Sequence, residues 1–213
     1  MVIRISEEQR ELSLSVGDLL ACNPFHHEPT GFKFGKRLSI GQKLHQEYGE
    51  KKSEKNGQVT TEKFVKLSFN HKANGKQWSV KLAGKIDVYH DKSGKTEIDE
   101  VKTLTPAEFD EIVRRKEVSD MYQRFMTQVQ LYLYMLEKAE GIKARGFLVL
   151  INIENGKIQK IAVNKDNMAG FIKENIDILL DEWQKRSQNL KKRAKNAKKV
   201  SFPFPTFRSI RNR

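Results

Sequence analysis

Cysteine is almost absent from this chain: Cys22 is the only one in 213 residues. An internal disulfide framework is therefore excluded, and the composition suits a reducing compartment. Long hydrophobic runs are missing too, since the longest, from Phe147 to Ile151, is far short of the roughly 18 apolar residues of a membrane span. The charged residues before Cys22 leave no apolar region for a cleaved leader. We therefore expect an intracellular, cytoplasmic protein with no membrane partner.

Acidic residues are absent from the C-terminal tail. Eleven lysines and arginines lie between Lys185 and Arg213, whereas the other residues carry 29 basic and 27 acidic groups, so the tail holds most of the formal net charge of +13. A cationic segment favours a polyanion, either nucleic acid or an anionic membrane surface. We predict one domain over residues 1–184 and a basic helix end and tail over 185–213. The residues expected to bind nucleic acid are Lys185, Arg186, Lys191, Lys192, Arg193, Lys195, Lys198 and Lys199.

The order of the expected elements indicates the fold class. Three β-rich runs, 62–69, 78–89 and 96–103, are separated by Asn74-Gly75 and Ser93-Gly94, which are typical of hairpin turns. We predict a first helix over 14–21 and a second from an N-cap at Ser39 to about residue 48. Helical sequence follows from Pro106 to about residue 140, with a break near Ser119, and a last helix begins at about residue 166. The last two strands, 146–154 and 157–163, lie on either side of Asn155-Gly156. This order predicts an α/β fold with a central mixed β-sheet flanked by helices.

The second hairpin places two carboxylates opposite each other. If Ser93-Gly94 is a two-residue loop, partners on its two strands have numbers that sum to 187, as Asp87 and Glu100 do. A four-residue loop gives the same register, whereas a loop of three or five residues does not. Directly opposed carboxylates lie about 5 Å apart at Cβ and repel each other unless a cation lies between them. Mg²⁺ and Mn²⁺ prefer oxygen ligands, so the pair predicts a divalent-metal site.

Lys102 follows Glu100 by two residues, so strand alternation points its ammonium group to the same face, beside a metal-bound phosphate. Glu-x-Lys is also common on solvent-facing strands, and Glu97 and Asp99 show that this strand is charged on both faces. Asp99 is therefore a rival to Glu100 as the second carboxylate. We favour Glu100 because Asp99 projects away from Lys102.

Gly84-Lys85-Ile86-Asp87, followed by a hairpin and Glu100-Val101-Lys102, resembles the core of PD-(D/E)xK nucleases. Gly41-Gln42-Lys43-Leu44-His45 resembles the helix-borne histidine of the RecB-like subgroup, and Gln128-Val129-Gln130-Leu131-Tyr132 resembles the Gln-x-x-x-Tyr helix of that subgroup. These pieces occur in the order of the family and cover about 40% of the chain. The resemblance implies a restriction-endonuclease-like core.

The resemblance implies a site for Mg²⁺ or Mn²⁺ whose ligands are His45, Asp87, Glu100 and the backbone carbonyl of Val101. The imidazole of His45 favours Mn²⁺. Lys102 either takes the proton of the attacking water or stabilises the transition state, and we favour the second role because it needs no depressed pKa. The implied activity is hydrolysis of DNA to 5′-phosphate and 3′-hydroxyl ends by a nucleoid-associated exonuclease. Single-stranded DNA and duplex ends are both candidate substrates.

Gln128 and Tyr132 are four residues apart and share a helical face. Their helix is apolar almost all round, so Gln128 needs a hydrogen-bond partner, which is a backbone group, Lys102 or the scissile phosphate. Gln130 and Tyr134 have the same spacing. We favour the first pair because the apolar continuation of the motif then follows it.

The CRISPR-adaptation (Cas-four-type) exonucleases of this subgroup are also similar in size and motif order, but they bind an iron–sulfur cluster through four cysteines. One thiolate cannot hold such a cluster, so none is predicted here. Cys22, His26 and His27 lack a fourth ligand for zinc. The departure argues against a specifically CRISPR role.

Two alternative functions fit the same features: a non-catalytic nucleic-acid-binding protein, and an interaction subunit of a DNA repair or recombination complex. The segment from Gly31 to Lys36 is one residue short of a Walker A motif and lacks its Ser/Thr, so a helicase partner would be a separate polypeptide. Phe202, Phe204 and Phe207 either stack on single-stranded bases or pin the tail to the core, and we favour the second. The sequence does not fix the oligomeric state.

Overall fold

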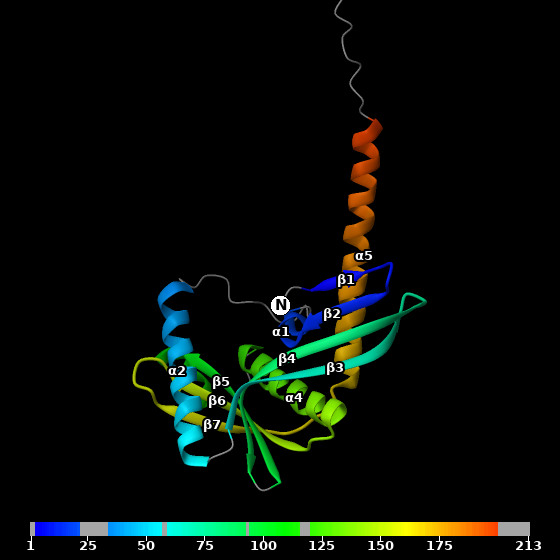
Figure 1. Cartoon of the computed structure of the whole chain (residues 1–213). Coiled ribbons are helices and arrows are strands. Elements are labelled where there is room, and N and C mark those ends of the chain that lie inside the picture. Colours follow the sequence, from blue (N-terminus) through cyan, green and yellow to red (C-terminus); the bar gives the residue numbers. More distant parts are fainter. Residues whose placement is uncertain (1–2, 22–33, 57–58, 93, 116–119, 200–213) are drawn as a thin grey trace, which may run out of the picture.

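The computed structural model describes residues 3–21, 34–56, 59–92, 94–115 and 120–199 (Figure 1). Cys22, His26, His27 and the phenylalanines of the tail lie outside these residues, as do the side chains of 191–199. The elements are β1 (Arg4–Ser6), β2 (Glu11–Ser15), α1 (Val16–Ala21), α2 (Phe34–Asn56), β3 (Val59–Ala73), β4 (Lys76–Lys92), β5 (Lys95–Leu104), α3 (Pro106–Arg115), α4 (Asp120–Glu140), β6 (Ala144–Asn152), β7 (Ile158–Val163) and α5 (Ala169–Lys199).

A seven-stranded mixed sheet forms the centre of the molecule, as predicted, in the order β1-β2-β4-β5-β6-β7 with β3 paired to β4. One edge of β4 pairs with β3. The other edge is shared, because β2 pairs with residues 79–83 and β5 pairs with residues 88–92. Within the described chain, residues 84–87 therefore have no strand partner on this edge, and the sheet has an opening there.

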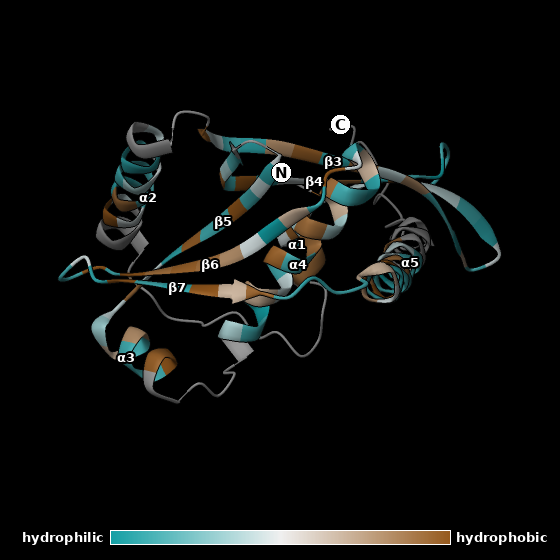
Figure 2. Ribbon diagram, turned by 90° about the horizontal axis from the view of Figure 1, so that it is seen from below, coloured by the Kyte–Doolittle hydropathy of each residue, from teal (hydrophilic) through white to brown (hydrophobic). Residues whose placement is uncertain are grey.

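Helices cover both faces of the sheet (Figure 2). The larger core packs α1, α3, α4 and α5 against one face, and it contains the fully buried Phe109, Leu131 and Ile176. The smaller core lies under α2 and contains Tyr48, Val88, Val101, Val149 and Ile151. The mixed α/β sandwich predicted from the order of the elements is confirmed.

The N-terminal strands were missed by the sequence analysis, which predicted a helix over 14–21. Leu12 and Leu14 alternate with half-buried residues in β2, and the helix begins only at Val16. Asp18 accepts hydrogen bonds from the backbone N–H and the hydroxyl of Ser15, and the Ser15 hydroxyl accepts one from the Asp18 N–H. This reciprocal capping fixes the start of α1 after Ser15.

Helix α2 is longer than predicted, because it begins at Phe34 rather than at an N-cap at Ser39 and continues to Asn56. Tertiary contacts of Tyr48 and Lys52 with the sheet, described below, account for the added C-terminal turns. Gly41 and Gly49 allow this close packing, since an added Cβ would lie 2.9 Å from the Thr103 hydroxyl and 2.7 Å from Thr61 Cγ2.

Other expected boundaries are confirmed. Asn74 and Gly75 both have positive φ, of 51° and 73°, as a type I′ hairpin turn requires. The predicted break near Ser119 lies outside the described residues, which resume at Asp120 with α4 after α3 ends at Arg115. Thr105 and Glu108 cap the start of α3, and Pro106 occupies its first turn.

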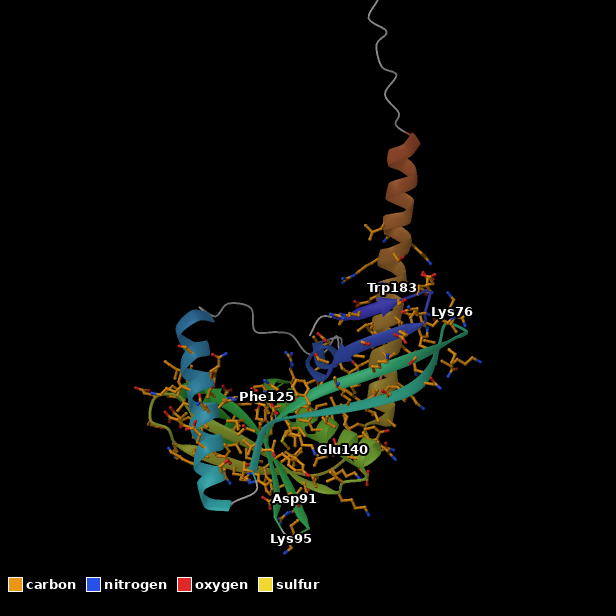
Figure 3. All side chains as sticks on the ribbon, viewed as in Figure 1. Lys76, Asp91, Lys95, Phe125, Glu140 and Trp183 are labelled. Atoms are coloured by element: carbon orange, nitrogen blue, oxygen red, sulfur yellow. The ribbon has the colours of Figure 1, made fainter. Side chains whose placement is uncertain are left out.

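Helix α5 leaves the body of the protein in its C-terminal half (Figure 1). Trp183 lies near the middle of α5 (Figure 3), and its ring is edge-on to that of Trp78, with 6.3 Å between the ring centroids. The helix is continuous across residue 184, so the division proposed there stays a prediction. In the part of the chain that the structure describes, every helix falls short of the length or apolarity that crossing a bilayer demands.

Candidate functional site

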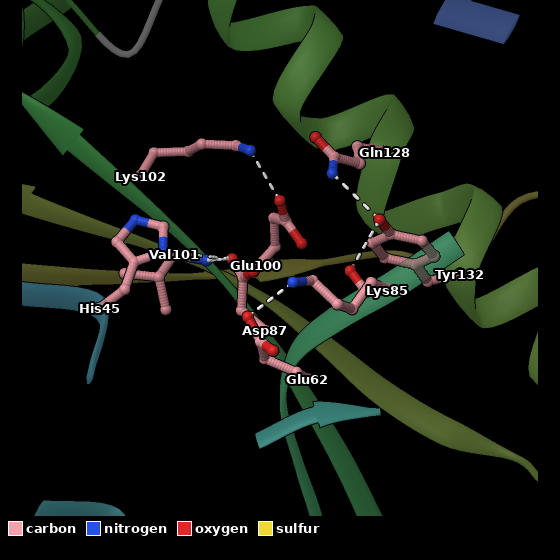
Figure 4. A network of polar contacts seen from close by, with 9 residues as sticks. All are labelled: His45, Glu62, Lys85, Asp87, Glu100, Val101, Lys102, Gln128 and Tyr132. Carbon is pink, nitrogen blue, oxygen red and sulfur yellow. Dashed lines mark hydrogen bonds and ion pairs between the residues drawn. The ribbon is translucent and has the colours of Figure 1, made fainter. Parts of the chain in front are cut away.

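The predicted register of the second hairpin is confirmed. Pairs from Val88↔Asp99 to Lys92↔Lys95 all have numbers that sum to 187. The ladder stops there, so Asp87 and Glu100 are the first positions beyond it. Asp87 Oδ2 instead accepts a hydrogen bond from the backbone N–H of Val101 at 2.8 Å (Figure 4). The side chain of Asp87 thus stands in the opening of the sheet, where β4 and β5 separate.

Glu62 lies opposite Asp87 on β3 and has an unusual backbone conformation, with φ of 57°. Thr61↔Val88 and Lys63↔Ile86 keep the same register on both sides, so the ladder is interrupted at this position without an inserted residue. The Glu62 side chain accepts from Lys85 Nζ at 2.6 Å. A left-handed glutamate costs on the order of 1–3 kcal/mol, and such conformations cluster at functional sites.

Glu100 is buried, with 2% of its surface exposed, on the same face as Lys102. Its Oε1 accepts a hydrogen bond from Lys102 Nζ at 2.6 Å, whereas its buried Oε2 has no hydrogen-bond partner among the described residues. Burial raises the pKa of Glu100 to about 7; the charge of Lys102 opposes this shift and that of Asp87 adds to it. A buried carboxylate oxygen without a donor is a place where a cation would be stabilised.

Lys102 lies between the two carboxylates and α4. Burial opposes its charge, but the carboxylates of Glu100 and Asp87 outweigh burial and raise the pKa of Lys102. Its Nζ also lies 5.2 Å from the centre of the Phe125 ring. The ammonium group therefore stays charged in this arrangement, which suits electrostatic stabilisation better than proton abstraction.

His45 projects from α2 towards the same opening, and its Nδ1 lies 3.9 Å from Asp87 Oδ2. This separation is too long for a hydrogen bond. Burial lowers the pKa of His45; Asp87 opposes that effect, while Lys102 adds to it. The neutral imidazole that results is the form that binds metal ions.

Gln128 and Tyr132 form a hydrogen-bonded chain on α4 (Figure 4). Gln128 Nε2 donates to Tyr132 Oη at 3.1 Å, and Tyr132 Oη donates to the backbone carbonyl of Lys85 at 3.0 Å. None of the three partners expected for Gln128 is the one observed. The chain satisfies a carbonyl in the unpaired segment of β4, whereas the rival Gln130 donates to the carbonyl of Asn164, away from the opening.

Replacing Gly84 by alanine is expected to destabilise the protein by about 1–3 kcal/mol, because the new Cβ would overlap Tyr132 Cε1 and lie 3.0 Å from Val16 Cγ2. Tyr132 would have to move away from the Lys85 carbonyl. Urea unfolding measures the loss. Gly170→Ala is the matched control, since nothing lies within 4 Å of its added Cβ; equal stabilities of the two variants would refute this role of Gly84.

A cavity of about 540 Å³ opens beside Asp87, between α2 and the strands β3 and β4. Its position connects the interrupted ladder with the helix that carries His45. The lining residues are polar or acidic: Gln42, His45, Gln46, Glu50, Thr61, Glu62 and Asp87.

Asp99, the rival carboxylate, is fully buried on the face under α2, away from Lys102 as predicted. It is the centre of a cluster: Tyr48 Oη donates to Oδ2 at 2.8 Å, His90 Nε2 lies 3.3 Å from Oδ2, and the Nζ atoms of Lys160 and Lys52 lie 2.9 and 3.8 Å from its oxygens. Burial would raise the pKa of Asp99, but these partners lower it to about 2. The Asp99 cluster ties α2, β4 and β7 to β5.

Asp99→Ala is expected to lower the free energy of unfolding by about 2–4 kcal/mol, because it leaves the half-buried Lys160 and Lys52 without their counter-charge and the Tyr48 hydroxyl without its acceptor. Chemical denaturation measures this loss. Asp91→Ala is the control, since Asp91 is exposed near the tip of the same hairpin (Figure 3) and its removal should change stability by less than about 0.5 kcal/mol. Similar losses in both variants would show that the cluster has no special role in stability.

The side chains around the opening in the sheet can be compared with the ligands that a metal ion requires. No group of three or more His, Cys, Asp or Glu within the described ranges is already arranged around a common point for a metal. However, Asp87, Glu100 and His45 converge on one opening, the Val101 carbonyl belongs to the same strand as Glu100, and Glu100 Oε2 lacks a donor. This oxygen-rich donor set fits a hard divalent ion.

An α/β fold that brings two carboxylates and a lysine together at an opening in its sheet has the arrangement that the sequence analysis expected of a nuclease. The family model of the PD-(D/E)XK nuclease superfamily matches residues 7–208, so the chain belongs to this superfamily. Its nucleases typically use divalent metal ions, and the fold implies binding of nucleic acid. A search of curated proteins found no match.

Solved structures that are similar to this chain include the following two. The crystal structure of SSO0001 has a TM-score of 0.54 and 19% identity over 83% of this chain and 78% of that one. A likeness at this identity shows the fold alone. A candidate exonuclease from Eubacterium rectale has a TM-score of 0.35 and 15% identity over 83% of this chain and 61% of that one.

The structure brings Asp87, Glu100 and Lys102 together and places His45 beside Asp87. The predicted nucleic-acid contacts Lys185 and Arg186 lie on α5, where Arg186 lines a second pocket together with Ile3, Ile5 and Trp183. Sequence reasoning missed Phe125, although its position three residues before Gln128 puts it on a neighbouring part of the same helical face. It also missed Glu62, whose backbone conformation leaves no signal in the sequence.

Proposed function

We propose that this protein is a metal-dependent deoxyribonuclease of the RecB-like subgroup. The observation that carries the proposal is the close approach of Asp87 and Lys102 to the buried side chain of Glu100. The Oε2 atom of Glu100 is buried and has no donor among the described residues. A divalent cation at that oxygen would relieve the repulsion between the carboxylates. The superfamily match and the order of the four sequence motifs support the same reaction class.

Asp87, Glu100, His45 and the Val101 carbonyl would hold the ion, which is Mg²⁺ or Mn²⁺. When bound, such an ion lowers the pKa of a water molecule and neutralises phosphate charge. Val101 N–H keeps the Asp87 carboxylate oriented in the opening, and the burial of His45 keeps its imidazole neutral. Lys102 stays charged beside Glu100 and is placed to stabilise the additional negative charge of the scissile phosphate.

The Gln128–Tyr132 chain has a positioning role in this proposal. Tyr132 holds the Lys85 carbonyl two residues before Asp87, and so fixes the backbone of the unpaired segment that presents the carboxylate. The basic residues of the tail add phosphate contacts that do not depend on base sequence. The substrate is DNA, cut from an end to give 5′-phosphate and 3′-hydroxyl products, in repair or recombination.

Digestion of DNA labelled at the 5′ or the 3′ end tests the proposal, with single-stranded, duplex and closed circular substrates in Mg²⁺, Mn²⁺ or EDTA. Label release from one end in the presence of metal, absent with EDTA and with Lys102→Ala, is the expected result. Cutting of the closed circle would replace exonuclease by endonuclease action. Binding of DNA without cleavage in either metal would overturn the proposal in favour of a non-catalytic nucleic-acid-binding protein.

A further inference from the structure

The β3–β4 hairpin has one face turned to solvent. From Lys63 to Ala73 the burial of β3 alternates, so that its odd-numbered residues face the core or are half-buried and its even-numbered residues are exposed. Phe64, Lys66 and Lys72 are exposed on β3, and Lys81 and Lys85 are exposed on β4. Phe64 pairs with Lys85 in the register of the hairpin. We call these five residues the outer hairpin face.

Phe64 is the most exposed of the large hydrophobic side chains that the structure describes, at 67%. It lies on an edge strand, where an exposed aromatic ring invites unwanted pairing with other chains unless charges flank it. Its neighbours on the same face are Lys66 and Lys85. An exposed ring flanked by Lys66 and by Lys85, which is itself paired with Glu62, has the features of a stacking platform for nucleic-acid bases.

The charges of this face are suited to a phosphate backbone. Lys85 is bridged to Glu62 at 2.6 Å and Lys81 lies 3.5 Å from Glu11. Lys66 and Lys72 form no ion pair with another residue that the structure describes. These two lysines are therefore the cations on the face whose charge the described part of the protein leaves uncompensated.

The outer hairpin face continues directly into the proposed active site. Phe64 is two residues from Glu62, which lines the cavity beside Asp87, and two residues of strand span about 7 Å. Lys66 follows on the same face, farther from the cavity. The cavity wall itself is polar and acidic, so the nearest exposed platform for a base along β3 is Phe64.

We propose that the outer hairpin face binds an unpaired strand of the substrate, with a base stacked on Phe64 and phosphates beside Lys66 and Lys72. The ligand class is single-stranded DNA, since the ring can stack only on a base whose face is not already covered by a stacked neighbour, as it is inside a duplex. This inference rests on the proposed function for the choice of DNA as the ligand. It assigns the substrate strand a path along β3 that ends at Asp87.

Fluorescence anisotropy with a labelled oligothymidine in EDTA tests the proposal, because it needs no cleavage. Phe64→Leu keeps an apolar side chain but removes the ring, and should weaken binding about five- to a hundredfold. Phe64→Tyr should bind within about twofold of the wild type. Lys66→Ala should reduce the salt dependence of binding by about one phosphate contact.

Ile158→Ala is the matched control, because Ile158 is also an exposed hydrophobic residue, at 50%, but lies on β7. It should leave the affinity unchanged. Wild-type affinity in Phe64→Leu, or an equal loss for blunt duplex and single-stranded DNA, would overturn the inference. A loss specific to single strands in a protein that never cleaves would contradict the nuclease proposal alone and leave this surface assigned.

Discussion

Glu100→Gln is expected to lower the rate of DNA cleavage at least about a thousandfold, which corresponds to ~4 kcal/mol of transition-state stabilisation. The substitution preserves size and keeps one oxygen, but it removes the buried negative charge that we propose as a metal ligand. It also removes the negative charge of the carboxylate that accepts the hydrogen bond of Lys102, whose Nζ lies 2.6 Å from Glu100 Oε1. Initial rates at saturating Mn²⁺ and saturating DNA measure the effect on the chemical step.

Glu97→Gln is the control for this variant. Glu97 lies on the same strand, and its partners are Arg145 and Lys160 rather than Lys102. The control removes one negative charge from β5 and should cleave within about threefold of the wild type. A Glu100→Gln variant that retains a tenth or more of the activity would exclude Glu100 from the reaction.

Mn²⁺ is expected to stabilise the wild-type protein by about 3 kcal/mol at a hundredfold excess over its dissociation constant, a gain of roughly 5–10 °C in Tm for a chain of this size. The physical reason is the donor-free Oε2 of Glu100, which lies buried beside a second carboxylate. Thermal unfolding with and without the ion measures the shift. Glu100→Gln and Asp87→Asn should lose most of it, whereas Glu97→Gln should keep it.

The stabilisation by Mn²⁺ should also depend on pH. Burial raises the pKa of Glu100 from 4.5 to about 7 in the folded, metal-free protein. Between these values the unfolded chain has lost a proton that the folded chain keeps, so this group makes stability fall as pH rises, by on the order of 3 kcal/mol in total. Mn²⁺ should therefore shift Tm more at pH 8 than at pH 5. A shift that is independent of pH and of Glu100 would place the ion elsewhere.

The register of the central hairpin could be predicted because two local rules determine it. A short turn fixes which residues are opposite, and the two-residue period of a strand fixes which share a face. These rules were sufficient to bring Asp87 near Glu100 and to separate Asp99 from Lys102. They depend on residues that are close in sequence, which is why the core of the site could be read without a structure.

The rest of the site depends on contacts between distant segments. Gln128 is satisfied by Tyr132, which is itself fixed by a carbonyl of β4, 47 residues away in the chain. The length of α2 depends on where Tyr48 meets Asp99, 51 residues later. Side-chain patterns within one element cannot show such partners, because burial decides which polar groups must find each other.

The short β1 and β2 strands show a second limit. Leu12 and Leu14 fit an alternating strand, but Leu14, Leu19 and Leu20 fit a short helix equally well, and periodicity over so few residues does not separate the two. The parallel pairing of β2 with β4 decides the outcome. That pairing is non-local, and it also determines where the partner strand of β4 changes.

The change of strand partner along β4 predicts how insertions in a distant strand would affect the site. The proposed catalytic groups lie at the gap between the β2–β4 and β4–β5 ladders, and the extent of this gap depends on where the pairing of β2 and of β5 with β4 ends. About four extra residues that lengthened β2 would extend its pairing along β4 over residues 84–87 and close the gap. Such a change should abolish the proposed activity while every proposed catalytic side chain was still present, so the sequence of those side chains alone would not reveal the loss.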